Sequence, residues 1–271
     1  MKLFAIRDEK NRPGDDLGYL LYYPKRKKFF IELADHAVAE DLPILLASFC
    51  RKGIRTIGSD WSRRFVAARI IPYERQNIEE ILSENDLPDY DEYQILTMTG
   101  GSCCQDDILL FPMEESHLSM EMTARLRKKL LEVTPIAHSR TVIAVFRNGI
   151  VKRADLSVWE RKREFTEIFQ KDSLFADMSV EVGGNGILWG KEPGISAEEL
   201  YSIGQTLAIS ADEMDQVAFG RMMDTAQACS ILNCSRQYLD QLVKKGKLRA
   251  HRTAAGRMLF RRYDIDRLFE I

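Results

Sequence analysis

Along residues 1–113, segments with the hydrophobic pattern of a β-strand are followed by segments with the pattern of an amphipathic helix. Short runs rich in β-branched and aromatic residues indicate strands, and apolar residues three and four positions apart indicate amphipathic helices. We therefore expect one mixed α/β domain here. The predicted strands are residues 19–23, 29–33, 95–98 and 108–111, and the predicted helices are residues 45–50, 61–71 and 77–82. The first two strands enclose a basic hairpin tip at residues 24–28, and the acidic, helix-prone residues 114–134 are expected to connect this domain to the next.

The pattern changes at residues 135–205, where strand-like runs are separated by turn signals. Residues 141–146 are a β-rich run, and the Asn148-Gly149 dipeptide after it is the strongest short hairpin signal, with residues 150–156 as the partner strand. The remaining predicted elements are a second hairpin over residues 178–182 and 187–189 and a helix that begins after Ser196, a good N-cap followed by two glutamates. A small antiparallel sheet with one or two helices accounts for this stretch.

Residues 135–205 resemble a small bacterial domain family of unknown function. The residues that carry the resemblance are Asn148-Gly149, Asp155-Leu156-Ser157, Leu174-Phe175, Ile187-Leu188-Trp189-Gly190 and Leu200-Tyr201. Some members of that family carry a helix-turn-helix directly after this domain, so the resemblance implies a fold and a companion but no activity.

Residues 18–110 resemble the small N-terminal subdomain of HipA-type toxin kinases. The matching residues are Gly18-Tyr19-Leu20, Leu42-Pro43 and Gly100-Gly101 ahead of Cys103. No kinase domain follows them, so this resemblance implies interaction with a partner rather than phosphoryl transfer.

Residues 221–271 have the pattern of two short helices, a hairpin and a closing helix. Asp224 and Gln227 make a capping-box pair, and Ser235 is a second N-cap. Asn233 stands where a turn between helices needs a positive φ, which Asn tolerates better than any residue except Gly. The expected buried positions are Ala228, Cys229, Leu232, Cys234, Leu239, Leu242 and Val243, and Gly246 is the expected stop of the second helix. Two strands are predicted at residues 248–251 and 258–260, with a turn at residues 253–256 and a closing helix from Tyr263.

The second of these helices leaves a polar face exposed once its apolar residues are buried. In the major groove, arginine can pair with guanine and glutamine with adenine, and arginines on the following hairpin can reach the DNA backbone or the minor groove. The candidate DNA-binding residues are Ser235, Arg236, Gln237, Tyr238, Gln241, Lys244, Lys245, Arg249, Arg252 and Arg257. Asp240 on the same helix would repel phosphate. The pattern predicts a recognition helix followed by a wing.

Residues 224–270 resemble the winged helix-turn-helix of the excisionase and MerR-type family. The matching residues are Ser235-Arg236, Lys245-Gly246-Lys247-Leu248, Phe260-Arg261-Arg262 and Asp264-Ile265. The departures from the family are Asn233 for the usual Gly, Cys229 and Cys234 for Ala and Val, and Leu259 where a basic residue is common. The resemblance implies that double-stranded DNA is the ligand.

The distribution of charge agrees with that expectation. The 271 residues carry a formal net charge of −2, which excludes a wholly basic nucleic-acid coat. Residues 221–271 nevertheless carry eleven basic and five acidic side chains, a net charge of +6, and residues 1–220 have a net charge of −8. A basic segment attached to an acidic body is typical of a nucleic-acid-binding domain.

Composition also bears on the compartment. The longest apolar stretch, residues 42–49, is far shorter than the roughly 20 residues that a membrane helix needs. The five cysteines lack paired spacings, which indicates reduced thiols. We expect a cytoplasmic protein without a membrane partner.

Other candidate chemistry is sparse. Cys103, Cys104 and Asp106 invite a thiol or metal site, but adjacent cysteines do not readily converge on one tetrahedral metal. No glycine-rich phosphate loop occurs. We therefore expect no catalytic residue, no metal and no cofactor. Arginines 63, 64, 69 and 75 could form a phosphate- or partner-binding surface, but we favour ion pairs with the nearby glutamates 79, 80 and 84.

The sequence thus predicts an α+β, multi-domain chain, with two small mixed α/β domains (residues 1–113 and 135–205) followed by a C-terminal winged helix-turn-helix (residues 221–271). The expected function is sequence-specific DNA binding by a homodimer, as a bacterial transcriptional regulator or antitoxin-like autoregulator, with the N-terminal domains available to a protein partner. Three alternatives stay open: an excisionase-like architectural protein, a protein-interaction module that does not bind DNA, and an enzyme that uses Cys103 or Asp106, for which the sequence offers little support.

Overall fold

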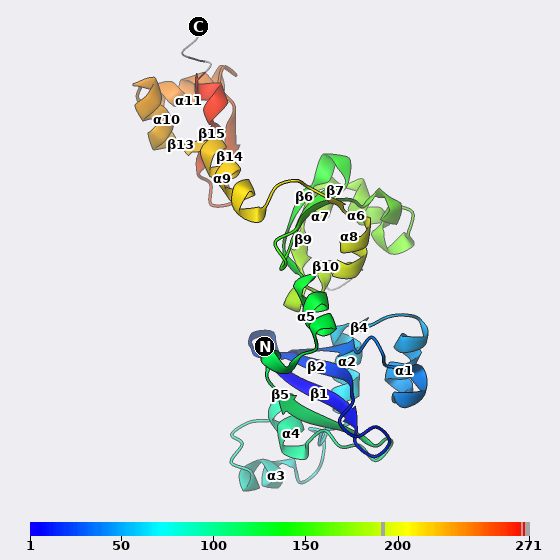
Figure 1. Ribbon diagram of the computed structural model, residues 1–271. Helices are drawn as coiled ribbons and strands as arrows, with labels where there is room; N and C mark the ends of the chain where they lie inside the picture. The colour runs from blue at the N-terminus through cyan, green and yellow to red at the C-terminus, as the bar shows by residue number, and fades with distance from the viewer. Residues whose placement is uncertain (191–192, 267, 269–271) are drawn as a thin grey trace. The chain divides into compact units, whose positions relative to one another are not determined.

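The computed structural model describes residues 1–190, 193–266 and 268 and shows an α+β chain (Figure 1). It forms two compact units: residues 1–148 with 152–205, which we call the first unit, and residues 149–151 with 206–271. Residues 191–192, 267 and 269–271 lie outside the described residues. Three sequence predictions therefore fall partly outside the described residues. They are the end of the last domain at residue 271, the charges of Arg267 and Glu270, and the last residues of the resemblance over residues 224–270.

A five-stranded sheet in the order β4-β3-β2-β1-β5 begins the first unit. Its strands are β1 (Lys2–Asp8), β2 (Asp16–Tyr23), β3 (Lys28–Leu33), β4 (Thr56–Ile57) and β5 (Ile108–Met113). The antiparallel pairing of β2 with β3 confirms the predicted hairpin, although Lys28 already belongs to the strand rather than to the tip. The sequence pattern did not predict β1, because this strand pairs on both edges and is covered on both faces, so its apolar run lacks the usual alternation.

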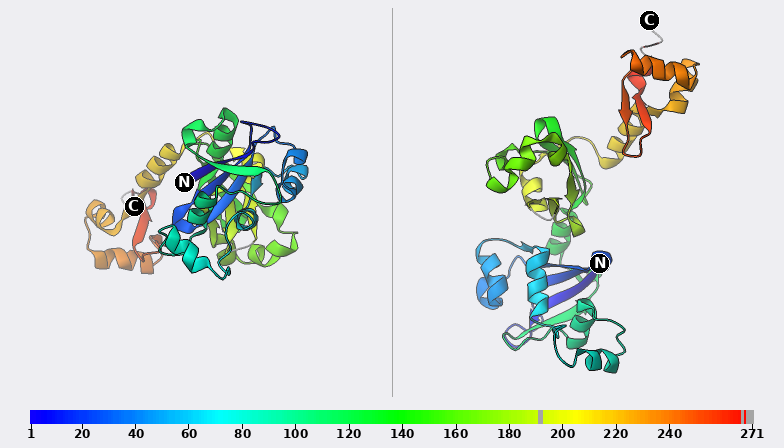
Figure 2. Two further views of the ribbon diagram at one scale, coloured as in Figure 1. Left: turned by 90° about the horizontal axis from the view of Figure 1, so that it is seen from below. Right: turned by 180° about the vertical axis from the view of Figure 1, so that it is seen from behind.

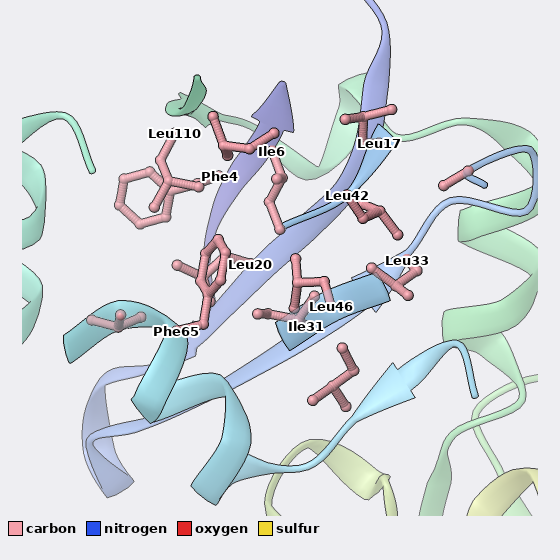
Figure 3. Close-up of a cluster of buried hydrophobic side chains, with 14 of the residues drawn as sticks. Phe4, Ile6, Leu17, Leu20, Ile31, Leu33, Leu42, Leu46, Phe65 and Leu110 are labelled. Carbon is pink, nitrogen blue, oxygen red and sulfur yellow. The ribbon is translucent and has the colours of Figure 1, made fainter. Parts of the chain in front are cut away.

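Helices cover one face of this sheet. They are α1 (Ile44–Arg51), α2 (Ser59–Ala67) and α4 (Glu92–Thr99), with α3 (Ile78–Glu84) following α2 in the chain. Figure 3 shows Leu46 of α1 and Phe65 of α2 among the strand residues Leu20 and Ile31. The view from behind in Figure 2 shows α2 lying across the strands. The first three predicted helices therefore form, but α2 ends at Ala67, before the predicted limit at residue 71.

The predicted strand at residues 95–98 is wrong, because these residues belong to α4. The Asp91 side chain accepts hydrogen bonds from the backbone N–H groups of Tyr93 and Gln94 at 3.1 and 3.2 Å, which starts the helix. Gly100, at a φ of 65°, ends it. A short apolar run fits a buried strand and a buried helix equally well, and here the two caps decide.

The opposite face of the sheet is covered by α5 (Met120–Arg127), which lies in the predicted connection and packs Met122 and Leu126 against Phe30. The period of two along β3 places Glu32 on the same face as Phe30. Glu32 is fully buried, and its carboxylate lies 2.5 Å from Lys129 Nζ.

Two further groups hold the Glu32 carboxylate. Arg125 of α5 lies 3.5 Å from its Oε2 atom, and the Thr56 hydroxyl donates a hydrogen bond to the same oxygen at 2.8 Å. The Lys129 ammonium in turn donates to the Thr56 hydroxyl at 3.1 Å. This buried network, Glu32, Thr56, Arg125 and Lys129, fixes the connecting segment to the first sheet.

Two smaller sheets complete the next part of the chain. One has the order β12-β8-β7-β6 and the other the order β11-β10-β9. Their strands are β6 (Leu130–Ile136), β7 (Thr141–Phe146), β8 (Val151–Asp155), β9 (Met178–Val180), β10 (Gly186–Trp189), β11 (Gly194–Ser196) and β12 (Gln205–Thr206), and the helices are α6 (Thr166–Gln170), α7 (Asp172–Ala176) and α8 (Ala197–Ile203). Both predicted hairpins form, and Ser196 with Glu199 makes a capping box. The predicted helical connection ends earlier than expected, because β6 already begins at Leu130.

The last elements of the chain run from α9 to α12, and we call residues 211–266 the C-terminal module. They are α9 (Ala211–Arg221), β13 (Met222–Asp224), α10 (Thr225–Leu232), α11 (Arg236–Lys244), β14 (Ala250–Arg252), β15 (Met258–Arg261) and α12 (Arg262–Asp266). The strands pair antiparallel in the order β13-β15-β14, and Figure 1 shows α10 and α11 beside them. The module's core includes Phe260 and Leu239. Two short helices, a hairpin and a closing helix are confirmed. Among the described residues, no helix is long and apolar enough to cross a membrane.

Candidate nucleic-acid interface

Helix α10 and the turn that joins it to α11 are set by local signals at both ends of the helix. Asp224 and Gln227 form the predicted capping box at the start of α10. At its end, Asn233 has the predicted positive φ of 47°, and the backbone N–H of Cys234 donates to the carbonyl of Cys229 at 3.0 Å. The backbone N–H of Asn233 donates to Ser230 at 3.3 Å, which completes a Schellman motif. This motif directs the chain straight into α11.

Helix α11 buries one face and exposes the other. The Ser235 hydroxyl accepts a hydrogen bond from the Tyr238 backbone N–H at 3.3 Å and caps the helix as predicted. Leu239 and Leu242 are buried in the core of the module. Gln237, Gln241 and Lys244, three and four residues apart, therefore share the face that points directly away from this core.

All ten predicted DNA-binding residues are exposed, but they do not share one line. Arg236 and Tyr238 flank the central row of Gln237, Gln241 and Lys244. The Ser235 hydroxyl accepts the cap bond, so only its O–H proton is available to a phosphate. Lys245 and Arg249 follow the helix, and Arg252 and Arg257 lie at the hairpin.

The hairpin of β14 and β15, which we call the wing, places two arginines beside its tip. Arg252 pairs with Met258 across the strands. The tip is closed by two bonds between Thr253 and Arg257: the Thr253 N–H donates to the Arg257 carbonyl at 2.9 Å, and the Arg257 N–H donates to the Thr253 hydroxyl at 3.1 Å. Gly256, at a φ of 75°, supplies the left-handed position that this turn requires. The two guanidinium groups therefore flank a short, ordered tip.

Among the residues that the structure describes, the basic side chains of this surface have no ion-pair partner. Within residues 1–190, 193–266 and 268, no salt bridge involves Arg236, Lys244, Lys245, Arg249, Arg252 or Arg257. Lys247 and Arg261 are exposed on the same module and also lack one in that part of the chain. Sequence reasoning counted these two charges but did not assign them to the site. The six predicted basic residues, together with Lys247 and Arg261, are thus available to bind phosphate.

The basic stretch of the first unit behaves differently. Arg63 donates to Glu92 at 2.9 Å, and the buried Arg69 forms an ion pair with Asp106 and lies over the Phe65 ring. Ion pairs were expected there, but with the wrong partners: Glu92 and Asp106 take the place of the glutamates 79, 80 and 84, because the fold brings α4 and the turn before β5 next to α2.

The ion pair with Arg69 also occupies Asp106, one of the residues considered above for a thiol or metal site with Cys103 and Cys104. Asp106 accepts from Arg69 and from the backbone N–H of Ile108 at 3.2 Å, and Cys103 forms a β-bridge with Asp106. Among the described residues, no group of three or more His, Cys, Asp or Glu side chains could hold a metal ion.

Comparison with known protein families agrees with a helix-turn-helix in the C-terminal module. Residues 222–270 match the family model of a helix-turn-helix domain. This segment is therefore a helix-turn-helix domain, a class of DNA-binding module, and it covers β13 to α12 of the structure. Neither the comparison with curated proteins nor that with solved structures gives a significant match.

Proposed function

We propose that this protein binds double-stranded DNA sequence-specifically and regulates transcription, as a bacterial regulator or an antitoxin-like autoregulator, and that it acts by binding rather than by catalysis. One observation carries the proposal: the exposed face of α11 and the wing present amide and guanidinium groups to solvent, with no ion pair to the cations in the described chain. Such groups hydrogen-bond to base edges and phosphates. Acidic residues 1–220 are proposed to contact a protein partner.

The proposed complex places α11 in the major groove. Gln237 and Gln241, one turn apart on the central row, suit adenine, and Arg236 near the N-terminus suits guanine. Lys244 and Lys245 follow the helix toward the phosphate backbone. Arg252 and Arg257 of the wing reach the neighbouring backbone or minor groove. Asp240 lies on the exposed side of α11 and disfavours close approach of phosphate there.

The test is a salt-titrated selection with the full chain and random genomic fragments, followed by sequencing. If about five phosphates are neutralised, the logarithm of affinity should fall with that of salt concentration at a slope of about −4 to −5. Enrichment of one sequence supports the proposal. Salt-sensitive binding without enrichment would contradict sequence specificity and favour an architectural role, and no binding at low salt would contradict the proposal altogether.

Two arginines should affect binding in different ways. Arg236→Ala is expected to cost about 1–3 kcal/mol on the preferred site and to relax the preference at one base pair, because it removes a base contact. Arg252→Ala should weaken binding to all sequences alike and reduce the salt slope by about 1. Competition binding with single-base variants of the selected site measures both effects. The matched control is Arg161→Ala, an exposed arginine of the first unit that should change neither.

We further propose that the protein binds DNA as a homodimer through α9. A single helix-turn-helix contacts few base pairs, so specificity usually requires two. Phe219 of α9 is 82% exposed and borders a groove of about 330 Å³ lined also by Met222, Ile231 and Arg262. In the proposed dimer, the α9 helices of two copies pair antiparallel, and Phe219 of each copy enters the groove of the other.

Phe219→Ser should therefore convert the dimer to a monomer and weaken binding to a two-fold symmetric site. The expected loss follows from removing a large exposed aromatic from the centre of a symmetric contact. Light scattering after gel filtration measures the mass, and titration of the symmetric site measures affinity. Val217→Ser is the control, since Val217 is 46% exposed on α9 but lies about 200° around the helix from Phe219. A wild-type monomer at all concentrations, or equal effects of both variants, would contradict this interface.

A further inference from the structure

The turn that joins α10 to α11 holds two cysteines next to each other. In a Schellman motif, the residue just after the left-handed position bonds back to the third residue before the helix cap, and the side chains of these two positions commonly touch. Here the two positions are Cys234 and Cys229, and their backbones are joined by the 3.0 Å bond from the Cys234 N–H to the Cys229 carbonyl. Both side chains pack against the core of the module.

The surroundings of the pair leave it open to small reagents. Both side chains are partly buried rather than sealed, and both are free thiols. Burial, together with the neighbouring Cys229 thiol, raises the pKa of Cys234, so Cys234 is held mainly as the thiol at neutral pH. Cys103 and Cys104 belong to the first unit and occupy a different turn.

We propose that Cys229 and Cys234 are a redox-modification site: a peroxide oxidises the pair to an intramolecular disulfide, and a dithiol reductant restores it. In the first step, the Cys229 thiolate attacks a peroxide oxygen, the O–O bond breaks, and a sulfenic acid and one water form after protonation. In the second, the Cys234 sulfur attacks the sulfenic sulfur, the S–O bond breaks, and a second water leaves with the proton of Cys234. The pair loses two electrons, and the peroxide gains them.

The disulfide would act on the DNA-binding surface through the turn. A disulfide requires a sulfur–sulfur bond of about 2.05 Å, much shorter than a contact between two thiols. Closing that gap moves Cys234 relative to α10, and Ser235, the N-cap of α11, is the next residue. The oxidised module therefore holds the start of α11 in a different position. The effect of the disulfide on DNA affinity rests on the proposed DNA binding, whereas the formation of the disulfide does not.

The experiment uses the full chain, reduced and then treated with hydrogen peroxide, followed by alkylation of free thiols and peptide mass mapping. The expected result is a linked peptide that contains Cys229 and Cys234 with the loss of two hydrogens, formed faster as the pH rises and reversed by a dithiol reductant. Cys229→Ala and Cys234→Val should each abolish the linked peptide. Cys103→Ser and Cys104→Ser are the matched controls and should leave it unchanged. Alkylation of both cysteines after peroxide treatment, or oxidation to sulfinic acid without a link, would overturn the proposal.

The same samples are then titrated with the selected DNA. Oxidation should weaken binding by roughly tenfold, comparable to the loss of one base contact, in the wild type but in neither variant. A disulfide that forms while affinity stays the same would overturn the effect on DNA binding. Absence of binding by the reduced protein would instead contradict the proposed function, and the linked peptide would still decide whether the redox site exists.

Discussion

Lys129→Met should lower the free energy of unfolding of the first unit by about 3–5 kcal/mol, because it leaves the Glu32 carboxylate buried with its nearest cation removed. Glu32 is fully buried and lies 2.5 Å from the Lys129 ammonium. Arg125, at 3.5 Å and shared with Asp35, compensates only in part. Urea unfolding followed by circular dichroism measures the change.

Two further variants separate a buried charge from simple loss of packing. Arg127→Met changes an exposed cation of α5 and should leave stability within about 0.5 kcal/mol. The double variant Glu32→Leu with Lys129→Met removes both charges and should recover much of the loss, since apolar replacement of a buried ion pair is often neutral. If the double variant is less stable than Lys129→Met alone, the account of Glu32 as an uncompensated charge is wrong.

Leu239→Ala should unfold the C-terminal module selectively. Leu239 is fully buried at the centre of a small core, and truncating such a leucine costs about 2–5 kcal/mol. A module of this size has little stability to spare. Calorimetry should show an early transition for the module and an unchanged transition for the first unit, and DNA binding should be lost.

Gln241→Ala on the same helix provides the comparison. Gln241 is exposed, so this variant should keep the thermal transitions of the wild type while changing base preference. A single transition that shifts as a whole in Leu239→Ala would contradict the expected selective effect on the C-terminal module.

Local signals in the sequence predicted the C-terminal module closely. Asp224, Asn233 and Ser235 each act within three or four residues of themselves, through a cap or a turn, so their effect does not depend on the rest of the fold. The same holds for Asn148-Gly149 between β7 and β8. The structure adds the sheet order β13-β15-β14, in which the strand before the first helix joins the wing.

Long-range features of the first unit could not be predicted in this way. Strand β1 and helix α4 both contain apolar runs whose type depends on what covers them, and the partners of Arg63 and Arg69 lie 29 and 37 residues away in sequence. For the candidate site, the residue types were predictable, but the central row of Gln237, Gln241 and Lys244 follows only once the buried face of α11 is known. The pairing of Cys234 with Cys229 through the backbone could also have been predicted, since a left-handed Asn233 implies it.

The continuity of α9 with β13 has a mechanical consequence. Helix α9 ends at Arg221, β13 begins at Met222 without an intervening loop, and β13 pairs with β15 of the wing. A torque applied to α9 therefore passes through the ladder of Met222 and Met223 to Arg261 and Phe260 and reaches the wing. Because α10 follows β13 directly, at Thr225, the same torque also reaches the helices that pack on this sheet. Twisting the helix that leads into the module would thus turn the wing and the helix-turn-helix together, as one packed body.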